Sequence, residues 1–326
     1  MPWSAALKTT DVDEFRAAVR PTTRNLTVTG RGRFSANLTR VDLHHVKMQR
    51  SQESLARAWE LELPPTRTAI AFGIEPGLTI GWRGVEIGTH EVIPMRSGVS
   101  GWHLLPSAAD WGSVSLSNDR LTQASIALTG RDLTPSRDAV AFTVPPSALG
   151  RLRRLHAAAG QLAETAPEII ANPDAARGLE QALTEAMLAC LGSTDVREDT
   201  AARRRHATIV RRLLALTDAR ADQAIYLPEI CNALGVNERT LQTCCQEQFG
   251  VSPKRYLVLR RLQLARRALQ AADPSPGGVT EIATRFGFWE LGRFAAYYRR
   301  AFGESPSTTL GACRRRDSGC NLAETA

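Results

Sequence analysis

The chain has 326 residues, of which 43% are hydrophobic and 23% charged, and it contains no apolar run near the ~20 residues that a membrane-spanning helix needs. The first ten residues lack a basic segment followed by an apolar stretch, so we expect no export signal and a cytoplasmic protein without membrane contact. The net charge of +8 is uneven, because residues 203–316 hold 20 Lys+Arg against 9 Asp+Glu. Such an excess is typical of a segment that binds phosphates, although a solvated basic face would give it too.

From Asp11 to about Val144 the apolar residues come mostly in short alternating runs, such as Ala69–Phe72 and Ala139–Val144. Period-two alternation interrupted by Gly and Pro is typical of antiparallel strands. We therefore predict an α+β protein whose N-terminal domain is sheet-rich and resembles a sandwich or a barrel. Three tryptophans in this region either belong to its core, which we favour, or line an apolar ligand pocket: Trp82, Trp102 and Trp111.

One local pattern in this half consists of Arg20-Pro-Thr-Thr-Arg24 followed by Asn37-Leu-Thr39. It resembles part of the cyclic di-GMP signature of PilZ domains, although Asp42 stands where that signature has glycine. The resemblance implies that the two guanidiniums hold phosphates and guanine edges, next to the Asn and Thr side chains. Exposed arginines without a ligand are the alternative. Two further arginines nearby that add charge are Arg31 and Arg33.

The histidines and cysteines lack the spacing of metal ligands. His44 and His45 are adjacent, so on a strand they would point to opposite faces, and His90 and His103 have no close partners in sequence. The six cysteines form no CxxC pair, and we expect them to be reduced and structural. No nucleophile elbow, phosphate-binding glycine loop or paired catalytic carboxylates are present. We therefore predict no metal, no cofactor and no catalytic residues.

After Pro145-Pro146 the apolar period becomes helical and continues to residue 191. Asn172-Pro173-Asp174 supplies an N-cap residue, a proline at the first helical position and an early acid, which together favour a helix start. The stripe that follows packs against its own domain, which we favour, or pairs with a second subunit. Its members are Leu179, Leu183, Met187 and Leu191.

Residues 226–249 have the layout of a helix, a tight turn and a second helix. Gly235 is suited to the positive φ that ends the first helix, and Asn237 is a good N-cap for the second. Ile230, Leu234, Leu241 and Phe249 are spaced to face a common core, with the small Cys231 where the helices cross. The second helix then presents side chains that reach base edges in a DNA major groove: Asn237, Glu238, Arg239, Gln242, Thr243 and Gln246, joined by Lys254 and Arg255 of the next helix.

A second copy of this layout spans Val279–Phe302, with Gly287 in the turn and Ala283 as the small crossing residue. The predicted core residues are Ile282, Phe286, Phe294, Tyr298 and Phe302. The predicted groove-facing residues are Trp289, Glu290, Gly292, Arg293, Ala296 and Tyr297, with Arg299 and Arg300 placed for phosphates.

Between the two copies, residues 253–271 predict one helix. Nineteen residues at ~1.5 Å each span ~28 Å, which approaches the ~34 Å between successive major-groove faces of DNA. A stiff connector of this length would set two DNA-binding helices about one turn apart.

Residues 205–311 resemble the DNA-binding domain of the AraC/XylS family of regulators. The matching segments are Leu234-Gly-Val-Asn237, Arg239-Thr-Leu241, Phe249-Gly-Val-Ser-Pro-Lys-Arg-Tyr256, Ala265-Arg-Arg-Ala-Leu269, Ile282-Ala283, Phe286-Gly-Phe288 and Phe302-Gly-Glu-Ser-Pro306. The resemblance implies a seven-helix domain that binds promoter DNA and usually activates transcription, with an N-terminal domain that binds an effector, dimerises, or does both. Two departures are Cys244-Cys245, where a polar residue and Phe are common, and a slightly expanded Asp273–Gly278.

These patterns predict four segments. Residues 1–191 form a sensor and dimerisation domain, with strands to about 144 and helices over 147–191. Residues 192–204 form a linker, 205–311 the DNA-binding domain and 312–326 a tail. We expect a bacterial transcription regulator with promoter DNA, RNA polymerase, a small effector (cyclic di-GMP is one candidate) and a second copy of itself as partners. The alternative is a metabolite-binding protein or enzyme with a basic helical appendage.

Overall fold

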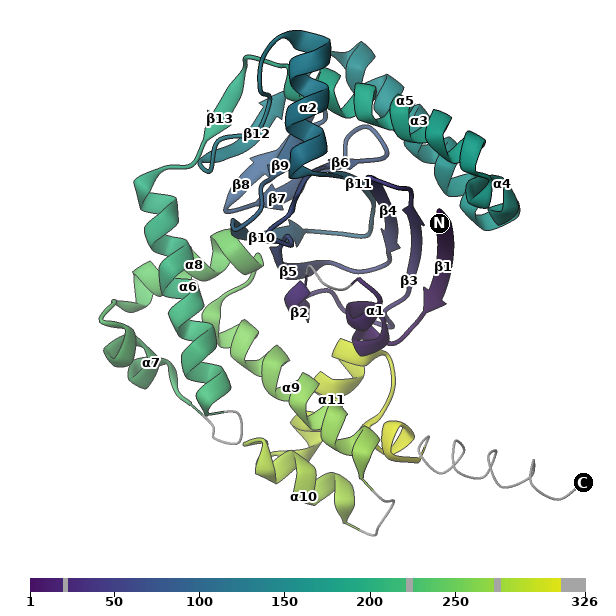
Figure 1. The fold of residues 1–326 in the computed structure, drawn as a ribbon. Helices are drawn as coiled ribbons and strands as arrows, with labels where there is room; N and C mark the ends of the chain where they lie inside the picture. The colour runs from purple at the N-terminus through teal and green to yellow at the C-terminus, as the bar shows by residue number, and fades with distance from the viewer. Residues whose placement is uncertain (20–22, 221–224, 273–276, 312–326) are drawn as a thin grey trace, which may run out of the picture. The chain divides into compact units, whose positions relative to one another are not determined.

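The computed structural model describes residues 1–19, 23–220, 225–272 and 277–311 (Figure 1). The chain forms two compact units, each described here by itself. The first comprises Met1–Leu26 and Phe34–Arg205, and the second comprises Thr27–Arg33 and the chain from His206 onward. Sheets followed by helices in the first unit and helices in the second confirm the predicted fold class. Among the described residues, no helix has the length and apolar character needed to cross a membrane.

The sheet-rich half is built from two antiparallel sheets. The larger sheet has the strand order β1-β3-β4-β11-β6-β9-β12-β13 and the smaller β2-β5-β10-β7-β8. The strands of the larger sheet are β1 (Trp3–Thr9), β3 (Ala36–Asp42), β4 (Val46–Glu53), β6 (Arg67–Gly73), β9 (Glu91–Met95), β11 (Ala109–Ser117), β12 (Ala139–Thr143) and β13 (Val196–Glu198). Those of the smaller sheet are β2 (Thr23–Val28), β5 (Arg57–Glu62), β7 (Ile80–Trp82), β8 (Val85–Ile87) and β10 (Ser100–Leu105).

Helices α3 (Pro146–Thr165), α4 (Pro167–Ala171) and α5 (Pro173–Leu191) lie in sequence between β12 and β13, and Figure 1 shows them beside β1, β3 and β4. The predicted N-cap of α5 is confirmed, because the Asn172 side chain accepts hydrogen bonds from the backbone of Asp174 and Ala175. The apolar stripe of α5 packs into the core that α3 and the larger sheet share. The stripe therefore stabilises its own domain, as we favoured.

Three features of this half differ from the expected pattern. Two helices lie within the predicted strand region, α1 (Val12–Ala18) and α2 (Asn118–Thr129). His44 and His45 are not on a strand, because both lie exposed in the connection between β3 and β4. Residues 192–204, the expected linker, contain β13, which pairs with β12 and extends the larger sheet. Such pairing depends on contacts distant in sequence, which local periodicity does not record.

The second unit is mainly helical. Helix α6 (Ala201–Ala219), for which no bounds were predicted, starts at the end of the first unit. The next helices begin and end close to the predicted residues: α7 (Leu227–Leu234), α8 (Glu238–Phe249), α9 (Pro253–Ala271), α10 (Gly278–Arg285) and α11 (Leu291–Phe302). Residues 306–311 are also helical. Helix α9 contacts α8, α10 and α11. One 19-residue helix thus connects two helix pairs, α7–α8 and α10–α11, as the sequence predicts.

Candidate nucleic-acid interface

The turn of the first helix pair is built as its glycine and asparagine predict. Gly235 ends α7 with a φ of 67°, a left-handed conformation that costs little only without a Cβ atom. Asn237 caps α8 by accepting a 2.8 Å hydrogen bond from the Thr240 backbone. Ile230, Leu234 and Leu241 are buried behind this turn. The core and the cap together hold α8 at a defined angle to α7.

The outward face of α8 carries the side chains predicted from the sequence. Glu238, Arg239, Gln242, Thr243 and Gln246 are all exposed, as is Asn237 before them. By contrast, the two cysteines of α8 are fully buried. Burial raises the pKa of Cys244 to about 11 and that of Cys245 to about 12, so both remain neutral thiols that pack as small apolar side chains.

The second helix pair repeats the arrangement with a larger aromatic core. Phe286, Phe294 and Tyr298 are buried, and the Tyr298 hydroxyl donates a 2.8 Å hydrogen bond to Thr309. Gly287 takes a φ of 76° in the turn. The predicted core residue Phe302 is only half-buried, because it lies at the rim, where the Arg266 guanidinium is 4.8 Å from its ring centroid.

Helix α11 presents an aromatic and basic outer surface. Trp289 is 77% exposed and Tyr297 41% exposed, which is unusual for large rings unless they bind something. Arg293 is exposed and pairs with Glu290 at 3.0 Å, one helical turn away. The remaining residues that we predicted on this surface are also exposed: Gly292, Ala296, Arg299 and Arg300.

Arginines gather where α9 begins and α11 ends, around a hollow of about 330 Å³. Arg31, Arg255 and Arg300 line it together with Lys254. Burial and the charges of Arg31 and Arg300 lower the pKa of Arg255, and the Arg255 side chain donates a 3.0 Å hydrogen bond to the Thr29 carbonyl. Within the described part of the chain, Lys254 alone of these four cations has a carboxylate partner, Glu238 at 3.8 Å. A hollow lined by like charges favours an anion such as a DNA phosphate.

Arg31 was not predicted to belong to this basic surface. Its position in the sequence placed it with the N-terminal arginines, whereas in the structure the segment Thr27–Arg33 belongs to the second unit. The Gly32 backbone N–H donates a 3.0 Å hydrogen bond to the Arg300 carbonyl, which fixes this short segment against the end of α11. No local signal in the sequence marks such a contact, because its partners are more than 200 residues apart.

The residues predicted to bind an effector are only partly described. Arg20 lies outside the described residues, and only the backbone of Arg24 is described, in β2. Asn37 is exposed on β3 and its amide nitrogen donates a 3.2 Å hydrogen bond to Gln52, whereas Thr39 is buried and donates a 2.6 Å hydrogen bond to Glu164. The described residues contain no group of three or more His, Cys, Asp or Glu side chains that could hold a metal ion.

Comparison with known families matches a helix-turn-helix domain to residues 230–312, within the helical unit. The chain is 43% identical over 102 residues, 31% of each protein, to the probable thc operon regulatory protein of Rhodococcus erythropolis. It is 34% identical over 104 residues, 32% of each protein, to the XylDLEGF operon transcriptional activator of Pseudomonas putida. The chain therefore matches only about a third of the length of these relatives.

Among solved structures, the AraC-like transcriptional activator CuxR aligns with 86% of this chain and 99% of its own length. The sequence identity is 15% and the TM-score is 0.43.

Proposed function

The helical unit of this chain is an AraC/XylS-type helix-turn-helix domain, and from this premise we propose that the protein is a transcription regulator that binds promoter DNA sequence-specifically. The observation that carries the proposal is the pair of exposed helices, α8 and α11, joined through one 19-residue helix. Polar side chains on α8 and the aromatic and basic side chains on α11 suit the edges of bases in a major groove. We place this activity in the cytoplasm, where bacterial promoters lie.

Each exposed surface has a separate part in the proposal. Arg239 on α8 and Arg293 on α11 read base edges, since an arginine fork matches the two acceptors of guanine. Lys254, Arg299 and Arg300, with Arg31 and Arg255 beside them, neutralise phosphates and give affinity without sequence preference. The positive excess of residues 203–316 supports this division, because most protein–DNA affinity is electrostatic.

We test the proposal with the full-length protein and genomic fragments of its source organism. Selected fragments are footprinted, and we expect two protected major-groove segments separated by about one helical turn. A protein with both Arg239→Ala and Arg293→Ala is the matched control and loses both protections. Protection of a single groove segment, or of none, would contradict the proposal.

The regulator is further proposed to activate transcription through contact with RNA polymerase and to respond to an effector bound by its sheet-rich half. An effector that favours the DNA-competent arrangement by ~1–3 kcal/mol changes the affinity for promoter DNA about 5- to 150-fold. A homodimer would double the number of DNA-binding helices. In vitro transcription from the selected fragments tests activation, and sedimentation with and without DNA tests dimerisation.

A finer form of the proposal names cyclic di-GMP as the effector. Its support is the RxxxR spacing of Arg20 and Arg24 with Asn37 and Thr39. Binding through Thr39 would have to replace its present hydrogen bond to Glu164. Calorimetry with the full-length protein and its Arg24→Ala variant tests the assignment. Heat with the natural protein and none with the variant supports it, and no heat with either discards it.

A further inference from the structure

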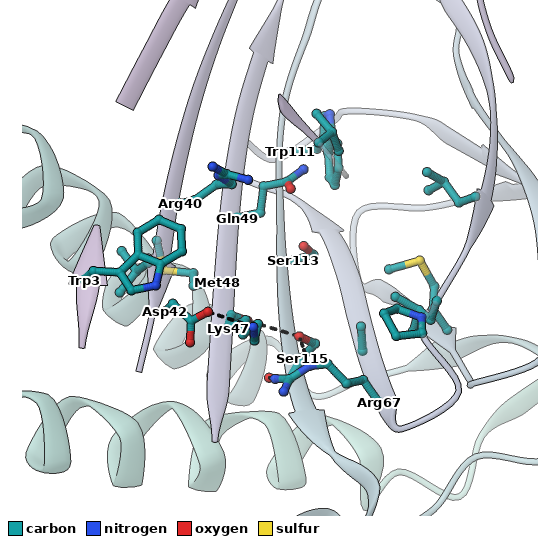
Figure 2. Close-up of a pocket in the computed structure, with 17 residues that line it drawn as sticks. Trp3, Arg40, Asp42, Lys47, Met48, Gln49, Arg67, Trp111, Ser113 and Ser115 are labelled. Atoms are coloured by element: carbon teal, nitrogen blue, oxygen red, sulfur yellow. Dashed lines mark hydrogen bonds and ion pairs between the residues drawn. The ribbon is translucent and has the colours of Figure 1, made fainter. Parts of the chain in front are cut away.

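A cavity of about 340 Å³ lies on one face of the larger sheet, in the first unit (Figure 2). Small side chains create it. Ala69 on β6 and Ser113 and Ser115 on β11 line it, and the strand register places Ser115 beside Ala69 on one side and Lys47 on the other. Large side chains at these positions would fill the space. A volume of this size lies within the range of about 300 to 1,000 Å³ that small-molecule sites occupy.

The cavity has one polar end. Strand pairing aligns Trp3, Asp42, Lys47 and Ser115 across β1, β3, β4 and β11. Asp42 and Lys47 form an ion pair at 2.7 Å, so these two charges neutralise each other. Arg67 enters from β6 beside them, and Figure 2 shows its side chain next to Ser115. The charge left over at this end is that of Arg67.

Arg67 is half-buried, and its hydrogen bonds go only to neutral oxygens. Its guanidinium donates to the Ser115 hydroxyl at 3.1 Å and to the carbonyls of Ser115 and His45 at 2.7 and 2.8 Å. Within the described part of the chain, Arg67 forms no ion pair with a carboxylate. Burial lowers its pKa, and only more distant acids such as Asp42 act against that effect. A half-buried cation without a counter-ion favours an anionic ligand.

Apolar side chains predominate away from the polar end, and hydrogen bonds hold one wall of the cavity in place. Leu61 and Met95 line it, and so does Trp111, which we had considered either a core residue or a pocket residue and which is both. The Trp111 indole nitrogen donates a 2.7 Å hydrogen bond to the buried Glu53 carboxylate. Glu53 in turn holds Arg57 at 2.8 Å, so the carboxylate that fixes the ring is itself held in a buried ion pair.

We propose that this cavity binds a small organic carboxylate with an apolar body. The carboxylate meets Arg67 at the polar end, and the apolar body lies against Trp111, Leu61 and Met95. The site deepens the proposed function and rests on it, because it names a chemical class of effector that is an alternative to cyclic di-GMP. A carboxylate is a planar two-oxygen acceptor that matches the fork of a guanidinium. Arg40, whose guanidinium lies 5.4 Å from the Trp3 ring centroid and donates to the Ala18 carbonyl, adds a second positive charge at the rim.

The test uses the full-length protein and three probe acids, namely benzoate, 3-phenylpropanoate and octanoate, each beside its neutral primary amide. Binding is followed by tryptophan fluorescence, since Trp3 and Trp111 line the cavity, and by the shift in melting temperature. We expect at least one acid to bind about tenfold or more tightly than its amide, the effect of a charge-assisted hydrogen bond. No binding of any acid at millimolar concentration, or equal binding of each acid and its amide, would overturn the proposal.

Three variants locate the site. Arg67→Gln is expected to weaken acid binding about tenfold or more, and Ser113→Leu to abolish it by filling the cavity. Arg96→Gln is the matched control, because Arg96 also holds a backbone carbonyl, that of Pro135, but lies outside the cavity. Acid binding that survives Ser113→Leu overturns the location even if Arg67→Gln proves unstable. DNA protection is measured on the same proteins, so a failure of acid binding with intact footprints rejects this cavity alone.

Discussion

The Arg293 guanidinium lies 3.0 Å from the Glu290 carboxylate at the start of α11, and both side chains are about two-thirds exposed. An exposed pair of this kind contributes little to stability, but it holds the arginine in one orientation. We expect Arg293→Ala, and likewise Arg239→Ala on α8, to weaken binding to the specific site by ~1–3 kcal/mol and to leave binding to random DNA much less affected. Competition titrations with specific and random duplexes measure the difference. Equal loss on both would reassign the arginine to the phosphate backbone.

The arginines around the hollow between α9 and α11 should behave differently. Removing Arg300, or the exposed Arg299 next to it in sequence, is expected to weaken binding to all sequences alike and to reduce the slope of log K against log salt by about one per phosphate contact. The control is Arg177→Ala, an exposed arginine of α5 in the other unit. Titrations at several salt concentrations give the slope. An unchanged slope for Arg300→Ala would exclude it from the phosphate contacts.

The helical unit could be predicted closely because its signals are local. A glycine with positive φ at position 235, a capping asparagine at 237 and apolar residues three and four apart lie within one turn or two of each other. The exposed surface followed from the same spacing. Phe302 was predicted to be a core residue but lies half-buried at the edge of the core. Periodicity indicates which face of a helix is buried, but not how far along the helix the core extends.

The sheet-rich unit was predicted only as a class of fold. The position of Arg67 in the cavity depends on β6 pairing with β11, although 38 to 50 residues separate the paired positions, and β13 pairs with β12 across three helices. Local alternation tells which residues share a face but not which strands are neighbours. Apart from Trp111, the cavity residues were therefore missed, although the charged residues Arg40 and Asp42, two positions apart, were a signal that one strand face is partly polar.

The buried ion pair behind Trp111 makes a prediction about stability. The Glu53 and Arg57 side chains are both fully buried, and Arg57 also contacts the ring nitrogen and the carbonyl of His103. Glu53→Gln leaves the guanidinium charge uncompensated, so we expect a loss of about 3–5 kcal/mol in the free energy of unfolding. Urea unfolding followed by tryptophan fluorescence measures it.

The matched control for this prediction is the exposed pair Asp174–Arg177, where Asp174→Asn should cost no more than ~1 kcal/mol. If Glu53→Gln lowers the free energy of unfolding no more than this control does, the buried pair contributes no more to stability than an exposed pair. The pair then does not hold the Trp111 side chain in place.

A pH effect follows from His156, a fully buried residue of α3. Its Nε2 lies 3.0 Å from the Gln49 carbonyl, and burial lowers its pKa from 6.5 to about 4. The unfolded chain therefore binds a proton below about pH 6.5 that the folded chain takes up only near pH 4. Stability is fully present above the unfolded pKa and is lost as the pH falls towards the folded pKa, by about 2 kcal/mol between pH 7 and pH 5 for this group. His103, whose pKa burial also lowers well below 6.5, acts in the same direction.

His156→Gln separates this contribution from the rest, because glutamine can donate to the Gln49 carbonyl but does not titrate. Denaturant titrations at pH 7 and pH 5 are expected to show a smaller loss of stability on acidification for the variant than for the natural protein, with the His103 contribution remaining in both. The imidazole packs closely on Gly112, because a Cβ atom built at that glycine would lie 2.6 Å from the ring. The substitution therefore also changes this packing. Comparing each protein at pH 7 and at pH 5 separates the packing effect from the effect of titration. Identical pH dependence in the two proteins would mean that the pKa of His156 is the same in the folded and the unfolded chain, in spite of its burial.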